Sequence, residues 1–188
     1  MINLYIDFDG VLVDTIKETY KMMGENDINL NDTDKVIKFY KELDWDKLLL
    51  NTKEINNSFK NIKKLQNSFI YNPCILTTVN SLNEINAKVS FIRSKNKDIN
   101  IICVPKGIDK CKMVNSKNAI LVDDYGGNLE PWIESGGFGI KFSNEESHKY
   151  ITIYSLNELL NKNVLKSLQK YNLINNLEIN DDICILKL

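Results

Sequence analysis

The stretch INLYIDFDGVLVD, residues 2–14, decides the fold of this 188-residue chain. Residues 2–6 form a short, largely apolar run, and the acidic segment Asp7-Phe-Asp9-Gly10 follows it directly. An apolar run of this length is typical of a strand that is buried on both faces of a parallel sheet. Ligands bind outside the carboxyl ends of such strands, so Asp7 and Asp9 are predicted to lie where a binding site forms.

Further apolar runs alternate with amphipathic segments along the rest of the chain. Strands are predicted at residues 74–76, 99–104, 119–122, 138–142 and 151–154, with a final strand at 183–188. Helices are predicted at residues 55–65, 82–92, 156–160 and 164–171, and a short one near Met113. The second of these begins with Ser81-Leu-Asn-Glu84, a capping-box pattern. Alternating strands and helices predict an α/β fold with a doubly wound parallel sheet.

One connection is much longer than the others. From Asp14 to about residue 51 the sequence has only helical patterns, whereas a strand-to-helix link usually takes about 2 to 6 residues. The excess predicts a small helical cap at residues 15–51, inserted after the first strand. The α/β core would then consist of residues 1–14 and 52–188.

Composition excludes several classes of protein. The 24 Lys and Arg residues nearly balance the 25 Asp and Glu residues, which argues against a nucleic acid polymer as partner. No apolar run reaches the roughly 20 residues of a membrane span, and no signal peptide is apparent, so we expect a cytoplasmic protein without membrane contact. The four cysteines lack zinc-ligand spacing and the chain has one histidine, which indicates reduced thiols.

Polar side chains follow three of the predicted strands: Asp7 and Asp9, Thr77 and Thr78, and Asp123 and Asp124. A single acid at a strand end is usually a turn former or a helix cap, but here four acids are predicted at one edge of the sheet. The ionised carboxylates would repel one another, and a bound cation would offset this repulsion. Oxygen ligands without His or Cys favour Mg²⁺, which commonly leaves coordination positions open for phosphate oxygens. The pattern therefore indicates phosphoryl chemistry.

Three motifs together resemble those of the haloacid dehalogenase-like (HAD) phosphohydrolases, and the resemblance covers about residues 1–160: Asp7-Phe-Asp9-Gly10-Val11-Leu12-Val13-Asp14, Leu76-Thr77-Thr78 and Leu121-Val122-Asp123-Asp124. The helical insert matches the smaller cap type of that superfamily. Residues 120–124, followed by Asn128-Leu-Glu-Pro-Trp132 and Gly136-Gly137-Phe-Gly139-Ile140, are similar to the 5'(3')-deoxyribonucleotidase branch.

The resemblance implies a role for each acid. Asp7 would be the nucleophile that forms an aspartyl-phosphate, and Asp9 would be the general acid and then the general base. The Mg²⁺ ligands would be Asp7, the backbone carbonyl of Asp9, and Asp124 directly with Asp123 in the outer shell, or the reverse. Thr77 would hydrogen-bond the transferring phosphoryl group.

A lysine should complete the phosphate site, and the sequence offers two main candidates. Lys88 lies on the helix where the deoxyribonucleotidase branch places it, but a helix that begins at Ser81 puts it almost two turns, or roughly 9 Å, from the helix start. Lys110 lies near the start of the helix after the third strand, where the wider superfamily often places it. Gly10 and Thr78 are further candidates for substrate contact. The cap aromatics Phe39, Tyr40 and Trp45 would either stack on a nucleobase or form the cap's own small core.

These observations favour a Mg²⁺-dependent phosphomonoesterase that acts on a small phosphorylated metabolite, with (deoxy)nucleoside 5'- or 3'-monophosphates as candidates. One alternative is a non-catalytic HAD-like binding scaffold. Another is a phospho-receiver-type signalling module, in which the acidic pair comes first and the phosphoacceptor lies on the third strand; here residues 99–104 end at Pro105 without an acid. The oligomeric state stays open, with a homodimer as one candidate.

Overall fold

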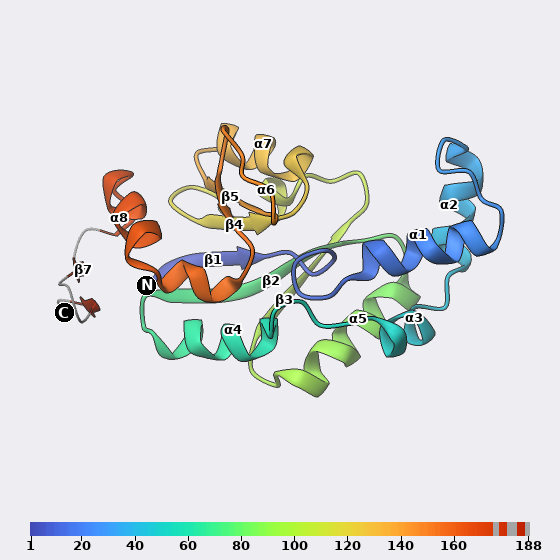
Figure 1. Cartoon of the computed structure of the whole chain (residues 1–188), viewed down its shortest axis with the longest axis horizontal. Helices are drawn as coiled ribbons and strands as arrows, with labels where there is room; N and C mark the ends of the chain where they lie inside the picture. Colours follow the sequence, from blue (N-terminus) through green and yellow to red (C-terminus); the bar gives the residue numbers. More distant parts are fainter. Residues whose placement is uncertain (175–176, 180–183, 187–188) are drawn as a thin grey trace.

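The computed structural model describes residues 1–174, 177–179 and 184–186. At its centre lies a parallel sheet with the strand order β3-β2-β1-β4-β5-β6 (Figure 1). The strands are β1 Ile2–Ile6, β2 Tyr71–Val79, β3 Asn100–Pro105, β4 Ile120–Asp123, β5 Phe138–Phe142 and β6 Ile151–Ile153. The chain order reverses at β1, which lies between β2 and β4 and opens a binding crevice at its carboxyl end. The predicted doubly wound α/β fold is thereby confirmed.

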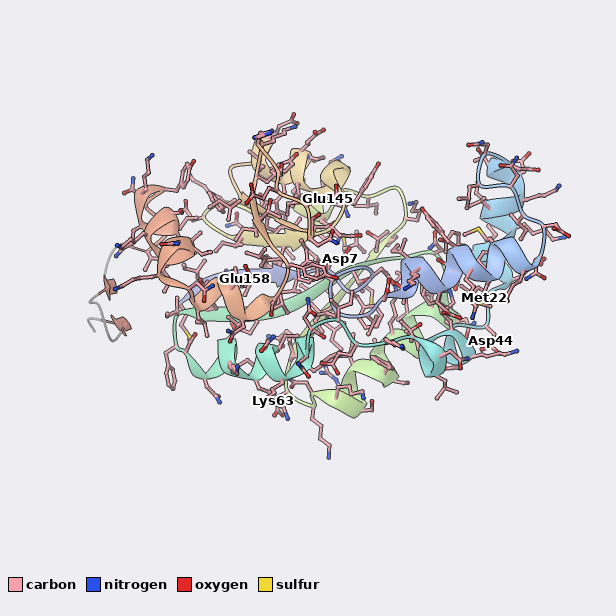
Figure 2. The ribbon with its side chains drawn as sticks, viewed as in Figure 1. Asp7, Met22, Asp44, Lys63, Glu145 and Glu158 are labelled. Carbon is pink, nitrogen blue, oxygen red and sulfur yellow. The ribbon has the colours of Figure 1, made fainter. Side chains whose placement is uncertain are left out.

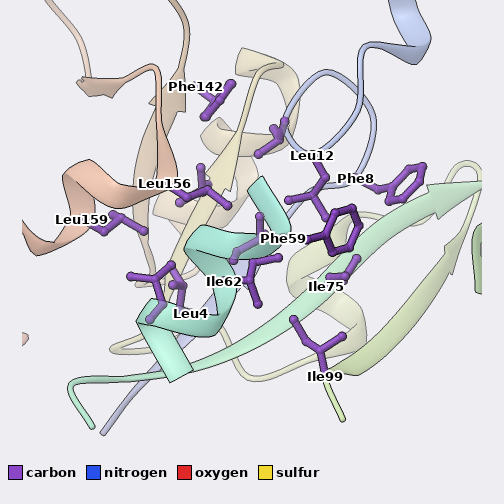
Figure 3. Packing of buried hydrophobic residues seen from close by; sticks show 14 of the residues in the cluster. Leu4, Phe8, Leu12, Phe59, Ile62, Ile75, Ile99, Phe142, Leu156 and Leu159 are labelled. Atoms are coloured by element: carbon purple, nitrogen blue, oxygen red, sulfur yellow. The ribbon is translucent and has the colours of Figure 1, made fainter. Parts of the chain in front are cut away.

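Helices cover both faces of the sheet, and this explains why the strands are apolar on both sides (Figure 1). The helices of the core are α4 Ser58–Asn67, α5 Leu82–Lys95, α6 Lys110–Met113, α7 Gly126–Glu134, the 3₁₀-helix η1 Leu156–Leu160 and α8 Lys162–Lys170. Alternate residues of β1 enter two separate cores. Leu4 packs into the larger core with Ile62 of α4 (Figure 3), whereas Tyr5 packs against the smaller core that contains Trp132 of α7.

Strand β2 is longer than its apolar run predicts. It spans Tyr71–Val79, whereas residues 74–76 were expected, so Thr77 and Thr78 lie inside the strand. Pairing explains the difference, because β2 lies between β1 and β3 and its hydrogen-bonded register runs from Tyr71 opposite Ile2 to Val79 opposite Pro105. Pairing with two neighbouring strands therefore keeps the ends of β2 extended, although the sequence there shows no continuous apolar run.

The C-terminal part differs in detail from the prediction. The edge strand predicted at residues 151–154 is β6, and the helix predicted at 156–160 is a 3₁₀-helix. The final strand predicted at 183–188 corresponds to β8 Cys184–Leu186, which pairs antiparallel with β7 Leu177–Ile179. Residues 183, 187 and 188 of that prediction lie outside the described residues.

Three helices fill the segment between β1 and α4: α1 Thr15–Glu25, α2 Thr33–Glu42 and α3 Trp45–Asn51. They gather at one end of the molecule, beyond the carboxyl end of β1 (Figure 1). The chain enters and leaves this cap side by side, since Asp14 N donates to Lys53 O (3.0 Å) and Ile55 N donates to Leu12 O (2.9 Å). No helix among the described residues is long and apolar enough to cross a membrane.

Candidate active site

Asp7 lies directly after β1, where the strand order reverses, and Figure 2 shows it between the core and the cap. Its backbone N–H donates to Val122 O (3.0 Å), which ties it to β4. Its side chain is 9% exposed, and the carboxylate accepts hydrogen bonds from Phe8 N and Lys110 Nζ, both at 2.8 Å. Burial raises the pKa of Asp7 to about 8, although the Lys110 charge opposes the shift.

Asp7 belongs to an acidic cluster that brings two strand ends together. One carboxylate oxygen each from Asp7, Asp123 and Asp124 lies within 4.8 Å of the others. Asp123 is fully buried and accepts hydrogen bonds from Tyr125 N (2.9 Å) and Asn128 Nδ2 (3.1 and 3.0 Å). Burial, followed by the neighbouring Asp123 charge, raises the pKa of Asp124 to about 6. Raised pKa values of this kind mark a site where a cation would stabilise the ionised carboxylates.

Gly10 closes the cluster on the side of the β1 loop. Its φ is +71°, and a Cβ at this position would lie 2.3 Å from Asp124 Oδ2. Only glycine allows the backbone to pass so close to this carboxylate.

Two buried lysines, Lys88 and Lys110, both enter the site. Lys110 Nζ lies 2.8 Å from Asp7 Oδ1 and 2.7 Å from Asp123 Oδ2. Burial alone would lower the pKa of this lysine, but the charges of Asp7 and Asp123 outweigh it, so the pKa is raised. The two lysines that the sequence offered as alternatives are therefore held by different acids of one site.

Lys88 reaches Asp9 from the seventh helical position after Ser81, because helical side chains lean toward the N-terminus of their helix. Its Nζ lies 2.5 Å from Asp9 Oδ2 and 2.7 Å from Glu84 Oε1. It also donates to Thr77 Oγ1 and Thr78 O, each at 3.2 Å. Burial opposes the charged form, but the Asp9 and Glu84 charges raise the pKa of Lys88, so the lysine stays protonated.

The Asp9 carboxylate points away from the acidic cluster. It accepts hydrogen bonds from Thr15 Oγ1 (2.7 Å) and Thr77 Oγ1 (3.5 Å) besides the Lys88 contact. Of the four acids predicted as metal ligands, three thus bring their side chains together. The fourth, Asp9, has its side chain engaged elsewhere, and its backbone carbonyl stays the predicted ligand atom.

A cavity of about 560 Å³ opens beside Asp9 and Thr78, between the cap and the core. Tyr40 and Trp45 line it, and Trp45 also stacks near Lys88, whose Nζ lies 4.8 Å from the indole ring centroid. Phe39 does not line this cavity, although its ring contacts that of Tyr40 edge-on. It lines a different cavity, of about 520 Å³, together with Met22 of α1 and Lys38 of α2.

Three site residues were not found by sequence reasoning. Glu84 was expected to cap its own helix, but its carboxylate accepts from Asn80 N (2.7 Å) and pairs with Lys88. Asn128 donates to both oxygens of Asp123; the sequence analysis placed it only at the start of the segment Asn128-Leu-Glu-Pro-Trp132 and gave it no role. Lys141 of β5 donates to the Asp124 backbone carbonyl, and nothing in its local sequence indicates this contact.

The donor set fits a hard divalent cation. Carboxylate oxygens dominate the site. The buried lysines Lys88 and Lys110 pair with four of its five acids, which are Asp7, Asp9, Glu84, Asp123 and Asp124, so with all five ionised the acids would exceed these lysines by three. One Mg²⁺ bound at the acidic cluster would offset most of that excess negative charge.

Several solved structures with the same architecture are named as hydrolases. A haloacid dehalogenase-like family hydrolase from Xanthomonas campestris superposes with a TM-score of 0.62 at 9% identity, covering 91% of this chain and 93% of that one. A HAD hydrolase, family IA, variant 3, from Entamoeba histolytica gives 0.60 at 14% identity, covering 90% and 100%. The chain has the fold of the HAD-superfamily hydrolases.

Another solved structure with this HAD-like fold is CbbY from Rhodobacter sphaeroides in complex with phosphate, with a TM-score of 0.57 at 12% identity, covering 85% of this chain and 97% of that one. No protein-family model matches the sequence, and no curated protein matches it either. In this HAD-like fold, the acidic cluster lies at the carboxyl ends of the neighbouring strands β1 and β4.

Proposed function

We propose that this protein is a Mg²⁺-dependent phosphomonoesterase that hydrolyses a small phosphorylated metabolite through an aspartyl-phosphate on Asp7. The observation that carries the proposal is the acidic cluster of Asp7, Asp123 and Asp124, with Lys110 bonded to Asp7 and Asp123 and with Asp9 a short distance along the same loop. The HAD-like hydrolase fold supports the same class of reaction.

Each residue would have a distinct part in this reaction. The Asp7 carboxylate attacks phosphorus while the bond from phosphorus to the ester oxygen breaks, and Asp9 gives its proton to the departing alcohol. Asp9 then takes a proton from water, whose oxygen attacks the phosphorus and releases phosphate from Asp7. Lys110 and Thr77 would stabilise negative charge on the phosphoryl group. The bound Mg²⁺ would keep Asp7 ionised and reduce its repulsion from the substrate phosphate.

The two buried lysines contact different catalytic acids, which suggests that they have different roles. Lys110 contacts the nucleophile and Asp123, whereas Lys88 contacts Asp9 and Thr77. We therefore propose that Lys110 orients the attacking carboxylate and that Lys88 orients the acid-base carboxylate.

Substitution of the nucleophile tests the proposal directly. Asp7→Asn keeps the size of the side chain but removes its nucleophilic oxygen, so Mg²⁺-dependent hydrolysis of p-nitrophenyl phosphate should fall by at least about a thousandfold. The exposed cap residue Asp46 gives a matched control, since Asp46→Asn should retain full activity. Circular dichroism checks that both variants are folded, and a folded Asp7→Asn protein that retains turnover would refute the assignment.

Within this class, we propose that the leaving group contains a flat ring, as in the (deoxy)nucleoside monophosphates. Support comes from Tyr40 and Trp45, which line the cavity beside Asp9. A Trp45→Leu substitution should then lower kcat/KM for a deoxyribonucleoside monophosphate more than for p-nitrophenyl phosphate. Equal losses on both substrates would assign Trp45 to packing alone.

A further inference from the structure

Two lysines without an acidic partner line the cavity beside Asp9, one from the cap and one from the core. Lys41 lies in the last turn of α2, and Lys106 follows β3. Both are exposed, and within the described residues neither side chain forms an ion pair. The two acids that line the same cavity, Asp9 and Glu84, already pair with Lys88.

The cavity wall between the active-site acids and these lysines is largely apolar. It includes Ile16 of α1 and Val36 and Ile37 of α2. Ile16 is 37% exposed and Ile37 is 48% exposed, and no residue of α2 is buried. The apolar face of α2 is thus left open to the cavity, where it can contact the apolar part of a ligand.

These features describe a substrate with two charged ends. Its phosphate would lie at Asp7, and the rest of the molecule would pass Asp9 and Thr78 into the cavity that Lys41 and Lys106 line. Two cations beside an apolar wall attract an anion more strongly than the same cations would on an open surface.

Resting on the proposed phosphomonoesterase function, we propose that the leaving group of the substrate carries, besides the flat ring, a second anionic group, which is a carboxylate or another phosphate. Lys41 and Lys106 bind this group and select such substrates over neutral phosphomonoesters of the same length.

Binding of non-hydrolysable phosphonates tests the inference without any need for turnover. Calorimetry in saturating Mg²⁺ would compare ω-phosphonoalkanoates with alkylphosphonates of equal length over a series of chain lengths. The proteins would be wild type, Lys41→Met, Lys106→Met and the double variant. Lys47→Met is the matched control, since Lys47 is exposed on cap helix α3 and does not line the cavity.

The wild-type protein should bind the ω-phosphonoalkanoate more tightly than the alkylphosphonate at the chain length that reaches Lys41 and Lys106. Each single substitution should reduce this preference by about twofold to fivefold, as expected for an exposed ion pair, and the double variant should lose it. Lys47→Met should retain the full preference, and added salt should weaken it.

The inference is overturned if wild type shows no preference at any chain length, or if the preference survives in the double variant. Turnover of the matched alkyl phosphates is measured separately. Failure to hydrolyse any of them would contradict the proposed function, while the phosphonate affinities would still decide the role of the two lysines.

Discussion

Magnesium binding to this protein should release protons, because the metal and the protons compete for the same carboxylates. Burial raises the pKa of Asp7 to about 8, and burial together with the Asp123 charge raises that of Asp124 to about 6. Each carboxyl is protonated below its pKa, and a cation binds the ionised form, so Mg²⁺ affinity must rise with pH. At pH 7, Asp7 would be about nine-tenths protonated and Asp124 about one-tenth, so binding should release about one proton.

The same competition fixes the expected size of the pH effect. Between pH 6 and pH 8 the Mg²⁺ affinity should increase by about 100-fold, or about 3 kcal/mol, and above about pH 9 it should be constant. Titration calorimetry in two buffers with different ionisation enthalpies measures both the affinity and the number of protons released.

A variant separates the two carboxyls. Asp124→Asn removes the carboxyl with the lower pKa. The steeper increase of Mg²⁺ affinity with pH below about pH 6 should then disappear, whereas the increase between pH 6 and pH 8, which Asp7 causes, should remain. A wild-type affinity that is constant from pH 6 to pH 8, with no proton release, would refute the argument that a cation is needed to ionise Asp7.

Three other perturbations have definite expected results. Gly10→Ala places a Cβ 2.3 Å from Asp124 Oδ2, so the carboxylate must shift and calorimetry should show Mg²⁺ affinity reduced by about 10- to 100-fold; unchanged affinity would mean that the loop adapts. Lys110→Met leaves Asp7 and Asp123 without their cation and should lower the free energy of unfolding in urea by about 3–5 kcal/mol, whereas Lys112→Met at an exposed lysine should change it by less than about 0.5 kcal/mol. Beryllium trifluoride, a phosphoryl mimic, should raise the melting temperature only with Mg²⁺ present, and an increase without Mg²⁺ would contradict a shared site.

The sequence predicted four acids at one edge of the sheet, and three of them, Asp7, Asp123 and Asp124, bring their side chains together, whereas that of Asp9 pairs with Lys88. Asp7 and Asp123 each stand at the carboxyl end of an apolar strand, and parallel strands bring such ends to one edge of a sheet. Their contact also requires that β1 lies beside β4, and local sequence patterns do not give this strand order.

The positions of the two candidate lysines could not be predicted from the sequence. Whether Lys88 or Lys110 reaches the site depends on how α5 and α6 pack on the sheet, and both reach it with different acids as partners. Glu84 is a different case, because it precedes Lys88 by four residues on one predicted helix, a spacing that favours an ion pair, and the capping-box interpretation did not use this signal.

The cap aromatics separate for a geometric reason. Neighbouring residues on a helix point about 100° apart, so Tyr40 can line the cavity beside Asp9 while Phe39 lines another. The sequence shows that both lie on one helix but not which side of α2 faces the core.

Identification of the phosphorylated residue tests the central claim most directly. Brief reaction with a phosphomonoester and Mg²⁺, followed by borohydride reduction of any acyl phosphate to homoserine, allows peptide mass spectrometry to locate the modified position. Our account predicts homoserine at position 7. Homoserine at another aspartate, or hydrolysis that proceeds without any homoserine, would contradict it.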